Sequence, residues 1–229
     1  MSRTVAFVFA RGQSKGIARK NLQPVGGIPL IAHSIRLARA CERIDTVVVS
    51  TDDDEIAAVA QAEGAAVPFR RPDDLATDTA PEWLAWQHAV TATQAALGAF
   101  DIFLSLPPTA PLRAMQDVEA VLDALPGCDL VLTGQAARRH PAFNMVERDD
   151  TGLVTLASPR PGITRRQDAP PLFDLTTVAY ATRPAFVMAS TGPWQGRVRL
   201  VEIPEERAID IDTPLDLVIA NAVWEQYHA

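Results

Sequence analysis

The residues best suited to bind an anion lie in one short segment near the N-terminus. The chain has 21 basic residues but only two lysines, and both of them, Lys15 and Lys20, lie within residues 10–21 together with Arg11. Lysine is a compact point charge and arginine a planar fork, so the two side chains are not interchangeable. The segment follows a buried-type strand at residues 4–9. A cationic, glycine-containing loop after a strand predicts a site for the phosphates of a nucleotide.

The glycines of this loop, Gly12 and Gly16, match neither a Walker A box nor a G-x-G-x-x-G fingerprint. No acidic residue occurs between Met1 and Arg39, so the loop is locally positive although the chain has a net charge of −7. On the residue types alone, a solvated basic surface turn remains the alternative.

A pair of carboxylates near the C-terminus could bind a cation. Asp210 and Asp212 are separated by one residue, and in an extended segment such a pair points to the same side. Two carboxylates that share a cation with phosphate oxygens suit Mg²⁺. The alternative is that Asp212 only complements the positive end of the helix that follows, while Asp210 is solvated.

Two further polar segments follow predicted strands. Residues 69–80 are rich in hydrogen-bonding groups and precede a helix, so they could contact a base and ribose or simply cap that helix. Residues 107–113 place three prolines after a strand, at the edge where open parallel sheets build a ligand crevice. The prolines could equally do no more than end the strand.

The expected elements alternate between strand and helix, which predicts an α/β, Rossmann-like fold with a mostly parallel sheet and helices on both faces. Thr213 and Pro214 form a helix start for the last element. Strands are expected at residues 4–9, 46–50, 65–69, 102–106, 130–132 and around 180, and helices at 29–38, 53–63, 81–97, 115–125 and 215–224.

Residues 134–175 break this rhythm. They are rich in proline and arginine, contain a hairpin-turn signal at Asp149–Gly152, and have no long helical pattern. Such an excursion could be a dimerisation arm, an active-site lid or a long surface loop.

Composition narrows the class of protein. With 229 residues, 48% apolar and 21% charged, the chain is expected to form one domain over residues 1–229. The acidic balance argues against nucleic-acid binding, and no apolar run is long enough for a membrane span. Two cysteines without metal-type spacing predict free thiols and a cytoplasmic protein.

Taken together, these segments resemble the acylneuraminate cytidylyltransferases, the CMP-sialic acid synthetases. The likeness is colinear over essentially the whole chain, and several ordered motifs are more specific than any one of them. The matching segments are Ala10–Asn21 (A-R-x-x-S-K-G-x-x-x-K-N), Val49–Asp52 (V-S-T-D), Arg71–Ala80 (R-P-x-x-L-A-x-D-T-A), Pro107–Arg113 (Q-P-T-S-P-L-R) and Asp210–Thr213 (D-I-D-T).

The resemblance implies a nucleotidyltransferase that uses CTP and Mg²⁺, and a homodimer whose arm lies within residues 134–190. Arg11, Lys15 and Asp210 would be catalytic. Asp210 and Asp212 would hold the metal. The nucleotide would be bound by Arg11, Gly12, Ser14, Lys15, Gly16, Lys20, Asn21, Arg71, Asp78 and Thr79.

On the sugar side the resemblance implies binding by Arg165, Arg166, Gln167 and Asp174, with one of the two arginines holding the sugar carboxylate. The family motif departs here, since Pro107 replaces a glutamine, Phe143 a lysine, and Asp174 an arginine. The expected acceptor is therefore a nonulosonic or related 2-keto-3-deoxy sugar acid rather than N-acetylneuraminate itself. The alternatives are an octulosonate-type acceptor, a non-catalytic nucleotide-binding paralogue and, less favoured, a glycosyltransferase.

Overall fold

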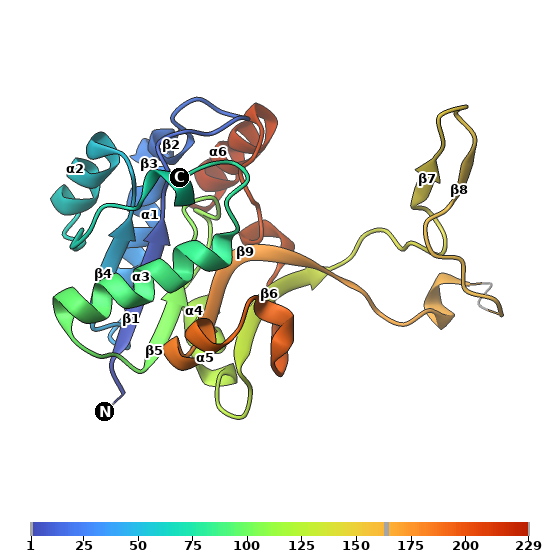
Figure 1. The fold of residues 1–229 in the computed structure, drawn as a ribbon. Coiled ribbons are helices and arrows are strands. Elements are labelled where there is room, and N and C mark those ends of the chain that lie inside the picture. Colours follow the sequence, from blue (N-terminus) through green and yellow to red (C-terminus); the bar gives the residue numbers. More distant parts are fainter. Residues whose placement is uncertain (1, 163–164, 229) are drawn as a thin grey trace.

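The computed structural model describes residues 2–162 and 165–228, and a six-stranded sheet forms its body (Figure 1). The strand order is β10-β6-β9-β5-β1-β4. Five strands run parallel to one another, and only β9 is antiparallel to its neighbours, β5 and β6. This confirms the expected mostly parallel α/β sheet. The strands are β1 (Thr4–Phe9), β4 (Thr46–Ser50), β5 (Ile102–Ser105), β6 (Leu130–Ala136), β9 (Phe173–Thr182) and β10 (Val198–Glu202).

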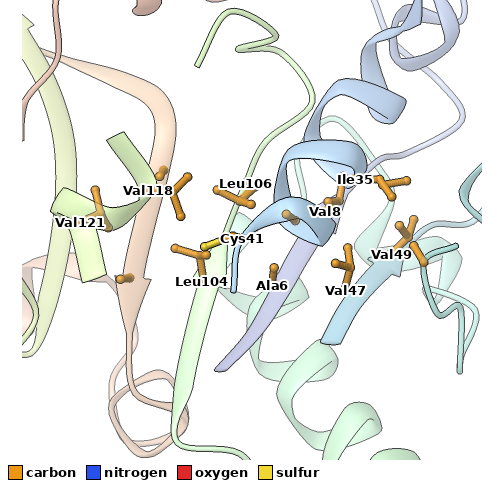
Figure 2. Close-up of a cluster of buried hydrophobic side chains, with 14 of the residues drawn as sticks. Ala6, Val8, Ile35, Cys41, Val47, Val49, Leu104, Leu106, Val118 and Val121 are labelled. Carbon is orange, nitrogen blue, oxygen red and sulfur yellow. The ribbon is translucent and has the colours of Figure 1, made fainter. Parts of the chain in front are cut away.

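Helices cover both faces of the sheet because the strands carry apolar side chains on both. In β1, Ala6 and Val8 pack with α1, α2 and α4 on one face (Figure 2), and Val5 and Phe7 pack with α3 on the other, where α5 also lies. Burial on both faces explains the lack of polar alternation in these strands. The covering helices are α1 (Leu30–Ala40), α2 (Asp54–Ala62), α3 (Glu82–Leu97), α4 (Met115–Ala124) and α5 (Pro184–Ala189).

The last helix, α6 (Pro214–His228), packs beside the phosphate-type loop. A small apolar cluster joins Ile17, Leu30 and Ile211 to Leu217 of this helix. Thr213 is confirmed as the helix start, since its N–H donates to Asp216 Oδ2 at 2.7 Å and Asp216 N–H donates to Thr213 Oγ1 at 3.3 Å. Two short strands, β2 (Pro24–Val25) and β3 (Ile28–Pro29), form a hairpin, and β2 packs against α6.

One predicted strand is wrong. Residues 65–69 form only an isolated bridge between Ala66 and Val48 and no strand. The apolar side chains there are still used, because Ala65 is buried in the core. Short 3₁₀ helices lie at Lys20–Leu22, Asp73–Leu75, Arg166–Asp168, Pro193–Gln195 and Glu205–Arg207.

An arm projects from the sheet between β6 and β9 (Figure 1). Its tip is a hairpin of β7 (Val146–Arg148) and β8 (Val154–Leu156), and every residue of both strands is exposed. The predicted turn closes it, with Asp149 Oδ1 accepting from Thr151 N–H at 2.9 Å. The excursion expected over 134–190 contains this arm, and its two ends belong to β6, β9 and α5.

Candidate active site

A polar cleft of about 280 Å³ opens at the carboxyl ends of the parallel strands β1, β4 and β5. Open parallel sheets bind ligands at this edge, because the loops after neighbouring strands converge there. The cleft brings together three segments that the sequence singled out, and we call it the polar cleft. Its lining includes Arg11, Lys20 and Asn21 from the first loop, Arg71 and Asp78 from the second, and Pro107 from the third.

The two glycines of the first loop are required by close packing. A Cβ on Gly16 would lie 2.2 Å from the backbone oxygen of Asp212, and a Cβ on Gly12 would lie 2.7 Å from Asp53 Oδ2. Gly12 N–H also donates to Asp52 Oδ1 at 2.9 Å. The first loop is therefore fixed against the end of β4 on one side and against the acidic pair on the other.

Each cation of the first loop has a carboxylate partner. Arg11 Nη1 lies 2.6 Å and Lys15 Nζ 3.0 Å from the two oxygens of Asp78, and Lys20 Nζ lies 2.9 Å from Asp212 Oδ1. The hydrogen bond from Lys15, followed by the charge of Arg11, lowers the pKa of Asp78. The Lys15 side chain is 78% exposed and that of Arg11 33%, whereas that of Lys20 is only 15% exposed. An incoming phosphate can therefore displace Asp78 from Lys15 and Arg11 at little cost.

Arg19 is a loop residue whose role the sequence did not reveal. It has a left-handed backbone (φ 54°), which is uncommon for a residue with a Cβ, and its guanidinium binds Asp53 and Glu55. The hydrogen bond from Arg19 is the main cause that lowers the pKa of Asp53 to about 2. Asp53 also caps α2, accepting from Ile56 N–H at 2.9 Å. No sequence signal marks a positive φ at an arginine.

Arg71 is buried at the wall of the polar cleft. Its Nε donates to Ser50 Oγ at 3.1 Å, its Nη2 donates to the Ser50 carbonyl at 2.6 Å, and its guanidinium carbon lies 5.4 Å from the Phe9 ring centre. Desolvation lowers its pKa to about 10, so the group remains charged at neutral pH. A buried, oriented guanidinium at this position can donate charge-assisted hydrogen bonds to a ligand in the cleft.

The proline segment after β5 is fixed by a second buried arginine. Arg113 Nη1 donates to Ser34 Oγ at 2.8 Å, and its Nη2 donates to the carbonyl of Pro107. Desolvation lowers the pKa of Arg113 to about 9. Pro107, Pro108 and Thr109 line the polar cleft as a result. These prolines thus do more than end a strand.

The acidic pair lies in the segment before α6, and neither carboxylate lines the polar cleft, since Asp210 lines a separate cavity of about 610 Å³ instead. Asp210 Oδ1 accepts from Thr177 Oγ1 at 2.9 Å, Thr109 Oγ1 donates to Thr177 at 3.2 Å, and Asp212 binds Lys20. Among residues 2–162 and 165–228, no three His, Cys, Asp or Glu side chains cluster as a complete metal site. Two carboxylates fit Mg²⁺ only if phosphate oxygens and waters supply the other ligands, which is its usual preference.

The residues expected to bind the sugar lie on the arm or at its root. Arg165 pairs with Asp168 at 2.7 Å, Gln167 is exposed, and the side chain of Arg166 lies outside the described part of the chain. Asp174 is exposed on β9, opposite Gln135 of β6. None of these described side chains lines the polar cleft, so their role stays a prediction. Thr77, which the sequence did not single out, lines the polar cleft, whereas five residues predicted to bind the nucleotide do not: Gly12, Ser14, Lys15, Gly16 and Thr79.

A second cavity, of about 400 Å³, shares a wall with the polar cleft. Its walls are largely aromatic, from Trp83 and Trp86 of α3, Tyr180 of β9 and Trp194. Glu82 lines both this aromatic pocket and the polar cleft. Desolvation raises the pKa of Glu82 and of Tyr180. Glu82 is the one residue that the linings of the two cavities have in common among the described residues.

Sequence comparisons decide the family. Residues 5–82 match the family described as cytidylyltransferase. The chain is 31% identical over 224 residues to CMP-N,N'-diacetyllegionaminic acid synthase of Campylobacter jejuni, covering 96% of this chain and 94% of that protein. The chain belongs to the acylneuraminate cytidylyltransferase family. The cytidylyltransferase is also 31% identical over 226 residues to post-translational flagellin modification protein B of Campylobacter coli, with the same coverage. It is 28% identical over 234 residues to pseudaminic acid cytidylyltransferase of C. jejuni, covering 99% and 98%.

Solved structures confirm the nucleotidyltransferase fold. CMP:2-keto-3-deoxy-manno-octonic acid synthetase, solved with CTP, superposes with a TM-score of 0.72 at 19% identity, covering 99% of the cytidylyltransferase and 100% of that chain. 4-Diphosphocytidyl-2C-methyl-D-erythritol synthase of Anaerococcus prevotii gives a TM-score of 0.69 at 15% identity, covering 98% and 96%. Within the described residues, the cytidylyltransferase has no helix long and apolar enough to span a membrane.

Proposed function

We propose that this enzyme transfers CMP from CTP to a nonulosonic or related 2-keto-3-deoxy sugar acid and releases pyrophosphate. The convergence of Arg11, Lys20 and Arg71 on one cleft is the observation that carries the proposal. Full-length relatives named for legionaminic and pseudaminic acid support the class of acceptor. The octulosonate-type alternative has the support of a fold likeness at 19% identity, so we favour the nonulosonic class.

The reaction requires positioning and charge neutralisation more than covalent chemistry by the protein. Arg11, Lys15 and Lys20 would exchange their carboxylate partners for the triphosphate oxygens, and Arg71 would orient the nucleoside. Mg²⁺ held by Asp210 and Asp212 would supply further neutralisation of charge on the transferred phosphate. Donors aimed at developing charge typically contribute about a hundred- to a thousandfold in rate.

The acceptor is assigned to the aromatic pocket, because it is the cavity that shares a wall with the polar cleft. An apolar, ring-lined cavity suits the acylamino or methyl groups that such sugars carry better than their hydroxyls. The sugar carboxylate still needs a cation. Arg165 or Arg166 would supply it from the arm of a second copy, which makes a homodimer part of this proposal. A cytoplasmic location also remains a prediction.

The test is a pyrophosphate-release assay with CTP and a panel of 2-keto-3-deoxy acids of eight and nine carbons. We expect release with a nine-carbon acid, dependence on Mg²⁺, and a loss of orders of magnitude in Asp210→Asn. UTP and GTP serve as control nucleotides. Release only with an eight-carbon acid would favour the octulosonate alternative. CTP binding without release from any acid would favour a non-catalytic paralogue.

A further inference from the structure

Glu82 occupies the boundary between the two cavities of the site. It is the first residue of α3, and it lines both the polar cleft and the aromatic pocket. Its side chain is accessible from these cavities rather than buried in the core. If a nucleotide binds in the polar cleft and an acceptor in the aromatic pocket, the acceptor hydroxyl and the phosphorus atom must meet where the two cavities adjoin, which is at Glu82.

One oxygen of the Glu82 carboxyl group accepts a hydrogen bond within the protein, and the other is available to a ligand. Trp86, one turn later in α3, donates its Nε1–H to Glu82 Oε1 at 3.2 Å. Oε2 has no hydrogen-bond donor among the described residues. The indole of Trp86 is buried against Phe103 and Trp83, so it fixes the orientation of the carboxyl group. The free oxygen can therefore accept a hydrogen bond from a bound molecule.

The groups around Glu82 set its affinity for a proton. Desolvation raises its pKa, and this outweighs the hydrogen bond from Trp86 and the charge of Arg71. Tyr180 faces it across the aromatic pocket, and Arg11, Lys20 and Asp78 line the polar cleft farther along. A triphosphate in that cleft would raise the pKa of the carboxyl group further, since it adds like charge. A carboxylate so perturbed is a stronger base than an ordinary one.

We propose that Glu82 is the general base that deprotonates the acceptor hydroxyl during transfer, an inference that rests on the proposed function. The O–H bond of the anomeric hydroxyl breaks, and its proton goes to Glu82 Oε2. The oxygen lone pair forms the new bond to the α-phosphorus as the bond to the bridging oxygen breaks, and that electron pair leaves with pyrophosphate. The proton then passes from Glu82 to water.

The test compares Glu82→Gln with the wild-type enzyme across pH. Glutamine keeps the shape of the side chain and the hydrogen bond from Trp86, but it cannot take a proton. We expect kcat to fall about a hundred- to ten-thousandfold, the acidic limb of the kcat–pH profile to disappear, and the Kd for CTP to stay within about twofold. Glu82→Asp should retain part of kcat and keep the limb. Asp74→Asn, which removes an exposed carboxylate of the preceding loop, should match the wild type.

The outcomes separate this inference from the proposed function. If the wild type releases pyrophosphate and Glu82→Gln keeps its kcat or its acidic limb, Glu82 is only a partner of Trp86 and the inference is wrong. If the wild type transfers CMP to no sugar acid, the proposed function fails first and the inference fails with it. Unchanged CTP binding in Glu82→Gln shows that the variant is folded.

Discussion

At the scale of single residues, Asp78 competes with an incoming anion for the cations of the first loop. Both of its carboxylate oxygens are bonded, one to Arg11 and one to Lys15. A phosphate that binds these cations must displace this carboxylate. The motif likeness assigned Asp78 to nucleotide binding, whereas the geometry describes a competitor for the same cations.

We therefore expect Asp78→Asn to bind pyrophosphate and CTP about two- to fivefold more tightly, because exposed ion pairs of this kind contribute little and are readily exchanged. Isothermal titration calorimetry at low and high salt measures the affinities, with Asp74→Asn as the matched control. The gain should shrink at high salt. Weaker CTP binding in Asp78→Asn would mean that Asp78 contacts the nucleotide itself.

Arg71 and its neighbour Arg70 form a natural pair for comparison. Arg71 is buried and makes a forked contact with Ser50, whereas Arg70 is exposed and pairs with Asp54. Arg71→Lys should raise the Kd for CTP at least about tenfold, because a lysine cannot replace a charged hydrogen bond worth about 1.5–3 kcal/mol in this geometry. Arg70→Lys should leave it unchanged. Equal effects in the two variants, measured by titration with CTP, would contradict the assignment.

At this scale the sequence indicated which residues converge, but not how they are paired. The unusual use of lysine and the ordered motifs led to Arg11, Lys20, Asn21, Arg71 and Asp78, all of which line the polar cleft. Glu82 escaped notice because a glutamate in a first helical turn is ordinary in sequence. Only its place between two cavities distinguishes it.

At the scale of elements, the first loop and the segment before α6 touch through a glycine. Gly16→Ala would place a methyl group 2.2 Å from the backbone oxygen of Asp212. A side chain could rotate away from such a contact, but here the backbone itself would have to move. We expect the loop to shift, with a cost of about 1–3 kcal/mol in stability and a larger loss of CTP affinity. Thermal unfolding and CTP titration measure both. Ala18→Gly, an exposed change of one methyl group in the same loop, is the control.

The start of α2 should give the protein a measurable acid sensitivity. Arg19 lowers the pKa of Asp53 to about 2 from an ordinary 3.8, so this ion pair stabilises the fold fully above pH 4 and loses its effect as the pH falls towards 2. Asp53→Asn keeps a good helix cap and removes only the charge. We expect it to cost about 1 kcal/mol at pH 7, allowing for the exposed Arg19, and only a small fraction of that near pH 2.

Thermal unfolding of Asp53→Asn and the wild type at pH 7, 4 and 2 measures this difference. Glu55→Gln removes the other, more exposed partner of Arg19 and is the control, with a smaller expected effect. A difference that persists unchanged at pH 2 would show that the charge of Asp53 is not the cause.

At the scale of the whole molecule, the arm exposes apolar side chains that water does not favour. Val146, Leu153, Val154 and Leu156 are between 38% and 72% exposed at its tip. A two-stranded hairpin with no buried face is only marginally stable alone. A second copy of the chain that covers this face is our proposed partner, and the acceptor site would depend on it.

Val154→Glu tests this proposal, because it would place a charge within the apolar face of the hairpin. We expect the variant to sediment as a monomer, to bind CTP as before, and to lose pyrophosphate release. Thr155→Glu, on the same strand with its side chain on the opposite face, is the matched control. A wild-type enzyme that sediments as a monomer at micromolar concentration would contradict the dimer.

Strands β1, β4, β5 and β6 and helices α1 to α4 were predictable because they follow local rules of periodicity, whereas β10 (Val198–Glu202) was not predicted. The alternation of elements predicted a mostly parallel sheet. What local rules could not place was β9, which returns from the arm and enters the sheet between β5 and β6. Its partners lie 37 to 79 residues away in the chain (Ala136↔Phe173 to Phe103↔Thr182), and pairing at such a distance leaves no local signal. For the same reason residues 65–69, although strand-like in composition, could not be recognised as a mere bridge.

The position of β9 delays completion of the sheet while the chain is being synthesised. Strands β4, β1 and β5 form one half of the sheet, β6 and β10 the other, and β9 alone joins them. A ribosome delivers residues in order, so the edge of β5 stays unpaired until the whole arm and then residues 173–182 have emerged. Throughout that interval the nascent protein presents an open, apolar strand edge, which is a template for aggregation. Chains truncated anywhere within the arm would keep that edge permanently.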